Sequence, residues 1–385
     1  MEWIRGEEIG RGGFAWINLA IPNKNLAGLP PLIAVKSCDL SHSATLGNEL
    51  EVLQSLGECP HVIRCFGAGQ TIEGGSELFN LLLEYAPGGS LANEMRKRGG
   101  KLTEPEVRRH ARSVLEALRH IHSHGIVHGD IKVQNILVFP PVDRCGCPEV
   151  KVADFGLARE AGCTIRPHKG EDEDEDEDED KDGEEHRGFE WRGTPLYMSP
   201  EAVNDNEYEA PSDVWALGCA VVEMATGRPA WSHPDGANVY SLMIRIGLGD
   251  ETPIIPHDLS EEGKDFLRKC FVRDPTKRWT AEMLLNHPFV ACKKDCQFVS
   301  PPHSPSPRTH FDFTDWNSSI QSSTISTQSS LVTSPREFWQ GKSEFGSFNN
   351  YDHHGSDSPI ERIHNLACDT RPDFEDSESL WITVR

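Results

Sequence analysis

The sequence His128-Gly129-Asp130-Ile131-Lys132-Val133-Gln134-Asn135 is followed, 24 residues after Asp130, by Asp154-Phe155-Gly156. These two segments carry a carboxylate at Asp130, an ammonium group at Lys132, an amide at Asn135 and a second carboxylate at Asp154. Phosphoryl transfer uses such groups, because a carboxylate holds the attacking hydroxyl, oxygen ligands hold magnesium, and cations stabilise the phosphates. The ordered set is far more specific than any one of its members. It predicts an enzyme that transfers a phosphoryl group.

A glycine-rich turn lies near the start of the chain, at Ile9-Gly10-Arg11-Gly12-Gly13-Phe14-Ala15-Trp16-Ile17. Dinucleotide-binding folds use a similar glycine pattern, but they follow it with a helix. Here residues 14–20 are rich in aromatic and β-branched side chains, which favours a strand. We therefore expect a hairpin whose glycine turn closes over phosphates. Considered alone, the segment is equally consistent with an ordinary β-hairpin turn.

The segment Ile33-Ala34-Val35-Lys36 is typical of an apolar strand that ends in a lone lysine. An ammonium group there can neutralise nucleotide phosphates when a carboxylate holds it in place. Glu49 is the expected carboxylate, with Glu51 as its rival. Glu49 lies among leucines that repeat at helical spacing, namely Leu46, Leu50, Leu53 and Leu56. The alternative is that Glu49 only belongs to a solvated helix face.

Together these motifs resemble a complete eukaryotic protein kinase domain over residues 3–289. The resemblance implies the two-lobed α+β kinase fold, with a β-rich N-lobe at residues 3–86 and a helical C-lobe at residues 87–289. The local patterns agree, since strand-like runs precede residue 86, and a capping box at Thr103 begins a long helical pattern. Ser199-Pro200-Glu201 stands where Ala-Pro-Glu is usual, and Arg278 is expected to pair with Glu201.

The resemblance also assigns roles to individual residues. Asp130 would accept the proton of the substrate hydroxyl, and Lys132 would stabilise charge on the γ-phosphoryl group. Lys36 would hold phosphates and pair with Glu49, while Asn135 and Asp154 would bind Mg²⁺. The residues expected around ATP are Ile9, Gly10, Gly12, Gly13, Ala15, Ile17, Ala34, Lys36, Leu83, Glu84, Ala86 and Leu137. Among them, Leu83 would be the gatekeeper that precedes the hinge.

Two features favour serine or threonine over tyrosine as the phosphorylated residue. Lys132 stands two residues after Asp130, as it does in Ser/Thr kinases. The segment Gly193-Thr194-Pro195-Leu196-Tyr197-Met198 resembles the substrate loop of those kinases. By that resemblance, Thr194 would bridge Asp130 and Lys132.

A narrower resemblance rests on residues 9–15, on Glu84-Tyr85-Ala86-Pro87-Gly88-Gly89-Ser90-Leu91, and on residues 130–137. These segments are similar to those of plant MEKK-type mitogen-activated protein (MAP) kinase kinase kinases, in particular short members with an N-terminal kinase domain and a C-terminal tail. The resemblance implies that the chain phosphorylates MAP kinase kinases in stress or abscisic-acid signalling. Fold does not fix a substrate. A pseudokinase scaffold, or a Ser/Thr kinase for another cytosolic protein, is the alternative.

Gly129 departs from the family pattern. Many regulated kinases carry an arginine at this position, and that arginine binds a phosphate on the activation loop. Glycine has no side chain to do so. We therefore expect an activity that does not depend on this phosphate. The alternative is that Arg159 or Arg192 binds a phosphate instead.

The composition indicates a reducing compartment. The count of eleven cysteines is odd, and residues 1–5 show no secretory signal, so free thiols are expected. Cys145-Gly146-Cys147 and the pair Cys292 and Cys296 lack a second half at zinc-site spacing. No apolar run approaches the ~18 residues that span a bilayer. We expect a cytoplasmic location, with the nucleus as a second compartment and no membrane partner.

The net charge of −23 is concentrated in one place. Residues 171–180 are all acidic, and residues 171–185 hold thirteen acidic residues and one lysine, a net charge of −12. This acidic insert, residues 168–187, lies in the activation segment between Asp154 and Glu201. Such a run repels itself and should be disordered. It is either a tolerated insertion or a device that steers a basic substrate segment. So negative a chain disfavours a nucleic-acid partner.

The end of the chain has a different character. Residues 300–335 are rich in Ser, Thr, Pro and Gln, so residues 290–385 are expected to form a disordered regulatory tail. Ser-Pro pairs are candidate sites for feedback phosphorylation by proline-directed kinases. They begin at Ser300, Ser304, Ser306, Ser334 and Ser358. The alternative is a solvated tail with chance pairs.

Overall fold

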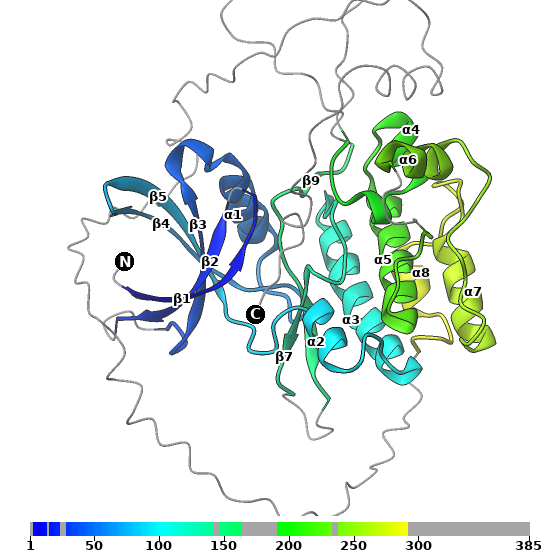
Figure 1. Ribbon diagram of the computed structural model, residues 1–385, viewed down its shortest axis with the longest axis horizontal. Coiled ribbons are helices and arrows are strands. Elements are labelled where there is room, and N and C mark those ends of the chain that lie inside the picture. The colour runs from blue at the N-terminus through cyan, green and yellow to red at the C-terminus, as the bar shows by residue number, and fades with distance from the viewer. Residues whose placement is uncertain are drawn as a thin grey trace, which may run out of the picture.

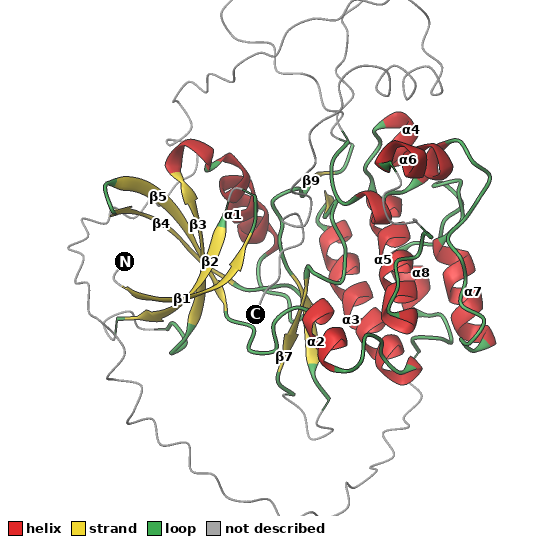
Figure 2. Cartoon of the chain, in the orientation of Figure 1, coloured by secondary structure: helices red, strands yellow, loops and turns green. Residues whose placement is uncertain are grey.

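The computed structural model describes residues 3–13, 15–23, 28–141, 147–162, 191–232 and 238–291. These residues form two lobes, one built on a β-sheet and the other mostly from helices (Figures 1 and 2). The two-lobed α+β fold expected from the sequence is therefore confirmed. The acidic insert at residues 168–187 and the tail beyond residue 291 lie outside the described residues, so the disorder expected of both segments stays a prediction.

The N-lobe sheet has five antiparallel strands in the order β1-β2-β3-β5-β4. The strands are β1 (Trp3–Arg11), β2 (Trp16–Pro22), β3 (Ile33–Asp39), β4 (Cys65–Glu73) and β5 (Ser76–Glu84). β1 and β2 form the predicted hairpin, in which Gly12 N–H donates to the carbonyl of Ala15 at 2.6 Å to close the turn. Side chains alternate along β3, so Ala34 and Lys36 face the second lobe while Val35 faces outward.

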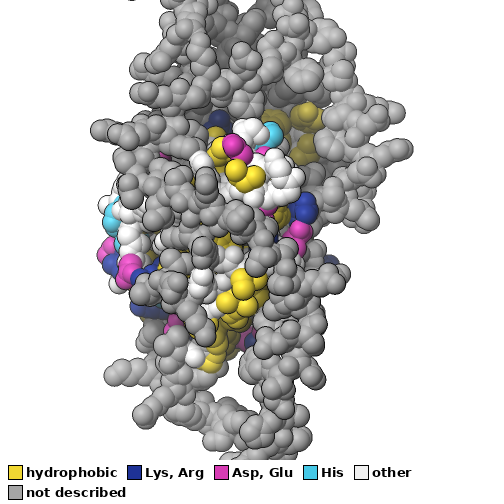
Figure 3. All heavy atoms as spheres, turned by 90° about the vertical axis from the view of Figure 1, so that its left-hand side faces the viewer, with side chains coloured by type: hydrophobic (Ala, Val, Ile, Leu, Met, Phe, Trp, Pro, Cys, Tyr) yellow, Lys and Arg dark blue, Asp and Glu magenta, His cyan; other side chains and the backbone are white. Residues whose placement is uncertain are grey.

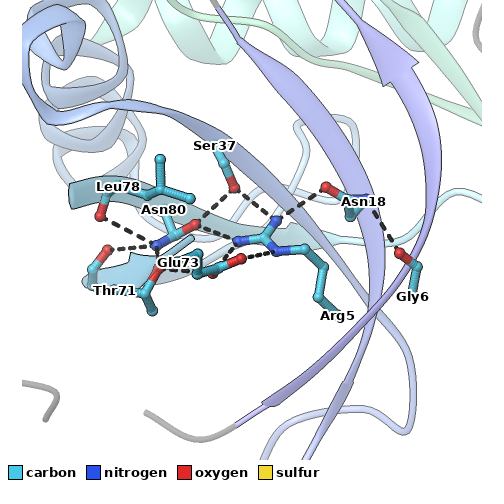
Figure 4. A network of polar contacts seen from close by, with 9 residues as sticks. Arg5, Gly6, Asn18, Ser37, Thr71, Glu73, Leu78 and Asn80 are labelled. Atoms are coloured by element: carbon cyan, nitrogen blue, oxygen red, sulfur yellow. Dashed lines mark hydrogen bonds and ion pairs between the residues drawn. The ribbon is translucent and has the colours of Figure 1, made fainter. Parts of the chain in front are cut away.

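The outward face of this sheet has a small apolar core and a polar network beside it. The apolar part consists of Ala20, Ile33, Val35 and Leu82, with Trp3 and Phe66 packed against them. The polar network centres on Arg5 in β1 (Figure 4). Figure 3 faces this end of the molecule, where hydrophobic side chains gather among charged ones.

A short 3₁₀ helix, η1 (Leu40–His42), leads from β3 into helix α1 (Ala44–Leu56). α1 packs on β4 and β5 through its apolar face, which includes Leu46, Val52 and Leu53. The helix stops at Gly57, whose φ of +65° suits glycine better than any residue with a Cβ. Glu49 lies on the inward side of α1 and is completely buried.

The second lobe begins with α2 (Leu91–Lys97) and the long helix α3 (Glu104–Ser123). The predicted capping box is present, since Thr103 N–H donates to the Glu106 carboxylate at 2.9 Å. Four short strands follow, and they carry the loops of the site: β6 (Ile126–Val127), β7 (Ile136–Phe139), β8 (Glu149–Val152) and β9 (Arg159–Glu160). β6 pairs with β9, and β7 pairs with β8.

The C-lobe core is organised around helix α5 (Ala210–Thr226), which is buried along most of its length. Around it lie η2 (Pro195–Tyr197), α4 (Pro200–Asp205), α6 (Val239–Gly247), α7 (Glu261–Cys270) and α8 (Ala281–Leu285). Arg278 makes the expected bidentate ion pair with Glu201, at 2.6 and 3.0 Å. Within the described residues, no helix is long and apolar enough to cross a bilayer.

Candidate active site

A cavity of about 370 Å³ lies between the two lobes, a size suited to a small organic ligand. The glycine turn, β3, α1, the β5–α2 connection, the loop before β7 and the loop after β8 all contribute to its wall. The sequence-predicted residues that line it are Ile9, Gly12, Gly13, Ala15, Ile17, Ala34, Lys36, Glu49, Leu83, Glu84, Ala86, Asp130, Lys132, Asn135, Leu137 and Asp154. Gly10 is the exception: it lies in β1, opposite Ile17, and is not part of the wall.

Lys36 lines the cavity and forms ion pairs with two carboxylates. Its Nζ lies 2.7 Å from Glu49 Oε2 and 2.8 Å from Asp154 Oδ1. Burial disfavours the ammonium form, but the adjacent charges of Asp154 and Glu49 outweigh it and raise the pKa of Lys36 above its ordinary value. Glu51, the rival partner, lies exposed on α1. A cation therefore sits in the cavity and can attract phosphate.

Glu49 connects Lys36 to the segment after Asp154. Its Oε1 accepts a hydrogen bond from Phe155 N–H at 3.1 Å, while its Oε2 faces Lys36. Complete burial raises the pKa of Glu49, and the charge of Lys36 opposes this shift. The two carboxylate oxygens thus fix the distance between β3, α1 and the Asp154 loop.

Asp154 combines an unusual backbone with an ionised side chain. Its φ of +68° is uncommon for a residue with a Cβ, and such strain gathers at functional sites. The charge of Lys36 lowers the pKa of Asp154 to about 2. Its side chain is still 42% exposed, so a ligand in the cavity can reach it. Asp154 is therefore a carboxylate at any physiological pH.

Asp130, Lys132, Thr194 and Asn135 form a second cluster. Thr194 Oγ1 donates to Asp130 Oδ1 at 2.8 Å and accepts from Lys132 Nζ at 3.0 Å. Lys132 Nζ lies 2.6 Å from Asp130 Oδ2, and Asn135 Nδ2 donates to the same oxygen at 3.0 Å. The expected bridge by Thr194 is thus observed. The cluster presents a carboxylate flanked by a cation in the wall of the cavity.

Asp213, near the start of α5, anchors the loop that carries Asp130 through hydrogen bonds to its backbone. Asp213 accepts from the backbone N–H groups of His128 and Gly129, both at 2.9 Å, and from His122 Nε2 at 2.9 Å. Burial would raise the pKa of Asp213, but these hydrogen bonds outweigh it and lower the pKa. His128 is buried and packs edge-on against Phe155, with ring centroids 4.8 Å apart.

Several features of the site were not predicted from the sequence. Thr45 and Ile63 line the cavity, although no local pattern marks them. The Glu84 carboxylate pairs with Lys151 of β8, at 2.7 and 2.8 Å, and so ties β5 to the second lobe. Gly88 packs closely against β7, since a Cβ at this position would lie 2.7 Å from the carbonyl oxygen of Val138. The Gly88-Gly89 pair in the sequence was a sign that a close approach of the backbone was possible here. Only glycine allows this approach.

Gly129 has a φ of +78°, and a Cβ at this position would lie 3.1 Å from the carbonyl oxygen of Leu157. A side chain here would therefore strain the loop. Arg159 is engaged elsewhere, since it donates to the Tyr208 carbonyl at 2.6 Å and stacks on the Tyr208 ring at 4.8 Å. Whether Arg159 or Arg192 binds a phosphate stays a prediction.

The donor set fits a hard divalent cation. Asp154 and Asn135 offer carboxylate and amide oxygens, the ligands that Mg²⁺ prefers. Among the described residues, no group of three or more His, Cys, Asp or Glu side chains is arranged to hold a metal ion by itself. Mg²⁺ matches this pattern, because it is usually held by one or two carboxylates together with the phosphates of a substrate. The six described cysteines are free thiols, as expected.

A nucleotide-sized cavity between two lobes, with a lysine–glutamate pair and two further carboxylates, defines a phosphotransferase of the kinase class. The family model described as protein kinase domain matches residues 3–290. The chain therefore belongs to the protein kinase family, whose members use ATP and a divalent metal ion.

The comparison with individual proteins narrows the class. Over 395 aligned residues, the chain is 47% identical to Mitogen-activated protein kinase kinase kinase 20 of Arabidopsis thaliana, and the alignment covers 100% of both chains. It is 36% identical to Mitogen-activated protein kinase kinase kinase 17 of the same plant, over 83% of this chain and 78% of that one. For Mitogen-activated protein kinase kinase kinase 18, the identity is 36% over 83% and 86%. The chain is a protein Ser/Thr kinase that groups with the plant MEKK-type MAP kinase kinase kinases.

Proposed function

We propose that this kinase transfers the γ-phosphoryl group of ATP to serine or threonine residues of a MAP kinase kinase. The chain of contacts from Glu49 through Lys36 to Asp154, next to the Asp130 cluster, is the observation that carries the proposal. A pseudokinase scaffold would not need these charges in contact, and buried charges are costly to maintain without a function. The names of the relatives support the choice of substrate class.

In the proposed reaction, Asp130 accepts a hydrogen bond from the substrate hydroxyl and orients its oxygen. That oxygen forms a bond to the γ-phosphorus while the bond from this phosphorus to the bridging oxygen breaks, and ADP leaves with the electron pair. The hydroxyl proton passes to Asp130. Lys132, whose Nζ lies 2.6 Å from Asp130 Oδ2, would stabilise the negative charge on the transferred phosphoryl group.

At the other end of the cavity, Lys36 binds the α- and β-phosphates, and Glu49 prevents it from swinging away. Ile9, Ile17, Ala34 and Leu137 line the cavity and would pack on the adenine, and the backbone from Leu83 to Ala86 would lie along its edge. Asn135 and Asp154 would hold Mg²⁺. When bound, Mg²⁺ neutralises the phosphates and lowers the cost of the charge that develops on them.

A kinase assay with purified protein tests the proposal. Wild type, Lys36→Met and Asp154→Asn proteins are each incubated with ATP, Mg²⁺ and a panel of MAP kinase kinases. Each panel member carries a substitution of its own ATP-binding lysine, so that it cannot phosphorylate itself. We expect the wild type to phosphorylate at least one member, and both variants to lose the activity by a factor of about 10² or more. Co-precipitation of the panel with the same variants is the control. Retained co-precipitation without any phosphorylation by the wild type would support the scaffold, and phosphorylation of other proteins alone would support a different substrate.

We further propose that the kinase domain spans residues 3–289, that residues 290–385 form a regulatory tail, and that the kinase acts in the cytoplasm and nucleus in stress or abscisic-acid signalling. The resemblance to plant MAP kinase kinase kinases supports this setting. Kinase activity recovered from plant cells should then rise after abscisic-acid treatment. Proline-directed kinases would phosphorylate the tail at Ser300, Ser304, Ser306, Ser334 and Ser358, and mass spectrometry after incubation with an active MAP kinase tests these sites.

The acidic insert is proposed to steer the basic segment of a substrate kinase toward the cavity. Deletion of residues 171–180 removes ten negative charges. The rate of phosphorylation of a basic MAP kinase kinase at low substrate concentration should fall, and the loss should shrink as salt rises from 20 to about 300 mM, because salt screens exposed charges. A short neutral peptide substrate is the control. An unchanged rate and salt dependence would show that the insert is only tolerated.

A further inference from the structure

Helix α1 holds the segment after Asp154 through two neighbouring residues, and only one of them has a role in the proposal above. Glu49 binds Phe155 N–H. Asn48, the residue before it, donates from Nδ2 toward three backbone carbonyl oxygens of the same segment. The distances are 2.9 Å to Ala158, 3.3 Å to Gly156 and 3.4 Å to Phe155. Asn48 thus gathers a turn of chain that lies more than 100 residues away in the sequence.

The chemistry of this contact requires an amide. All three acceptors are carbonyl oxygens, and an asparagine side chain offers two N–H donors that can serve them. A carboxylate of the same shape would offer no donor and would face three negative dipole ends. The contact is half-buried, so water replaces a lost hydrogen bond only in part.

Three features indicate why residues 155–158 need a second hydrogen-bonded contact with α1, in addition to Glu49. Asp154 is strained at φ +68°. Gly129 provides no side chain to bind the activation segment from the catalytic loop. On the side of α1, a Cβ at Gly156 would lie only 2.7 Å from Thr45 Cγ2, so the helix and the segment are already in close contact. Thr45, Asn48 and Glu49 are three and four residues apart, so they form one face of α1 turned to this segment.

We propose that Asn48 is a positioning residue for phosphoryl transfer. Its amide ties α1 to the carbonyls after Asp154, and thereby keeps Glu49, Lys36 and Asp154 in contact without help from a phosphate on the activation segment. The inference rests on the proposed kinase function for its catalytic consequence. Its structural part, the anchoring of residues 155–158, can be measured without any activity.

The matched pair Asn48→Asp and Gln54→Glu tests the proposal. Both substitutions turn an amide into a carboxylate on α1, but Gln54 is exposed and away from the segment. The first readout is hydrogen–deuterium exchange of peptides covering residues 152–160 in the protein without nucleotide. Exchange should speed up several-fold in Asn48→Asp and stay at the wild-type rate in Gln54→Glu. The second readout is steady-state kinetics, where kcat should fall about 10-fold, the loss of roughly one hydrogen bond, with KM for ATP changed less than about 2-fold.

Asn48→Ala, which removes the donor without adding a charge, guards against a folding defect in the first variant. It should show the same rise in exchange, with the thermal midpoint within a few degrees of wild type. Wild-type exchange over residues 152–160 in both Asn48 variants would overturn the proposal, and so would a fall in kcat without any change in exchange. A wild-type protein that phosphorylates nothing would instead overturn the proposed function, and the exchange result would still decide whether Asn48 anchors the segment.

Discussion

At the scale of single residues, Lys36 and Glu49 illustrate what a sequence can reveal about a site. The helical spacing of leucines around Glu49 indicated which face of the helix would be buried, and a buried glutamate needs a cation. The structure places that cation, Lys36, 2.7 Å away. Asn48 had no comparable signal, because its acceptors are backbone carbonyls, which every residue has. Its partners were therefore invisible until the chain was folded.

Buried His110 on α3 gives a prediction about pH. Burial, aided by the positive charge of Arg109, lowers the pKa of His110 to about 4. In the unfolded chain this histidine keeps an ordinary pKa near 6.5, so the unfolded state binds more protons between these values. Stability should therefore fall as the pH drops below 6.5, by about 2 kcal/mol from this residue at pH 5.

The measurement is urea unfolding at pH 7.5 and pH 5.0 for wild type and His110→Gln. The variant is uncharged at both pH values, so its loss of stability between them should be smaller by about 2 kcal/mol. Exposed His257 offers the control: His257→Gln should behave as wild type. Equal losses in wild type and His110→Gln would show that His110 takes up its proton in the folded state.

At the scale of secondary-structure elements, the sequence predicted best what depends on neighbours in the chain. The β1–β2 hairpin follows from the glycine turn, and α3 begins at the capping box of Thr103. The link between β5 and β8 made by Glu84 and Lys151 was not predicted, because its two residues are 67 positions apart. Charge alone does not indicate which of many lysines will form an ion pair with a given glutamate.

The N-lobe sheet carries the clearest case of such a long-range contact. The guanidinium of Arg5 in β1 uses all five of its N–H donors (Figure 4). They go to Glu73 of β4 twice, at 3.0 and 2.9 Å, and to Asn18 of β2, Ser37 of β3 and Asn80 of β5 at 2.8 to 3.0 Å. One side chain on the outward face therefore joins all five strands.

Arg5→Met should destabilise the N-lobe by about 3 kcal/mol, because it leaves Glu73 without its cation and removes hydrogen bonds from Asn80 and Ser37. Denaturant unfolding measures this loss. Arg11→Met on the same strand is the matched control, since Arg11 is exposed and pairs only with Glu8 among the bonds described. The control should leave the midpoint nearly unchanged. Equal effects of the two substitutions would mean that the network adds no more than a surface pair.

At the scale of the whole molecule, the two lobes bring segments that are far apart in the sequence to one cavity. These segments stand in the order of protein kinase motifs, and the fold was predicted from that resemblance. The sequence could not tell where the acidic insert or the tail beyond residue 291 lies relative to the lobes, and both segments are outside the described residues. Composition indicates how such segments interact with solvent, but it does not say where they lie.

The state of the activation segment gives a prediction for the whole enzyme. Gly129 has no side chain that could bind a phosphate. The segment is held instead by two hydrogen bonds to backbone carbonyls, from Asn48 to Ala158 and from Arg159 to Tyr208. Protein treated with a phosphatase, and then freed from it, should keep most of its activity toward a MAP kinase kinase. The control is a kinase known to need activation-loop phosphate, treated in parallel. Loss of activity after phosphatase, with recovery on rephosphorylation, would contradict this prediction and support the alternative that Arg159 or Arg192 binds a phosphate.

Asp130, Lys132, Lys36 and Asp154 are proposed to act together on the terminal phosphate of ATP. The most direct measurement is the transfer of radiolabel from [γ-³²P]ATP to a MAP kinase kinase by wild type and by Asp130→Asn, which keeps the shape of the side chain but cannot take up the proton. We expect label on serine or threonine with the wild type and a loss by a factor of about 10² or more with the variant. Equal labelling by both proteins, or no labelling of any polypeptide by the wild type, would contradict it.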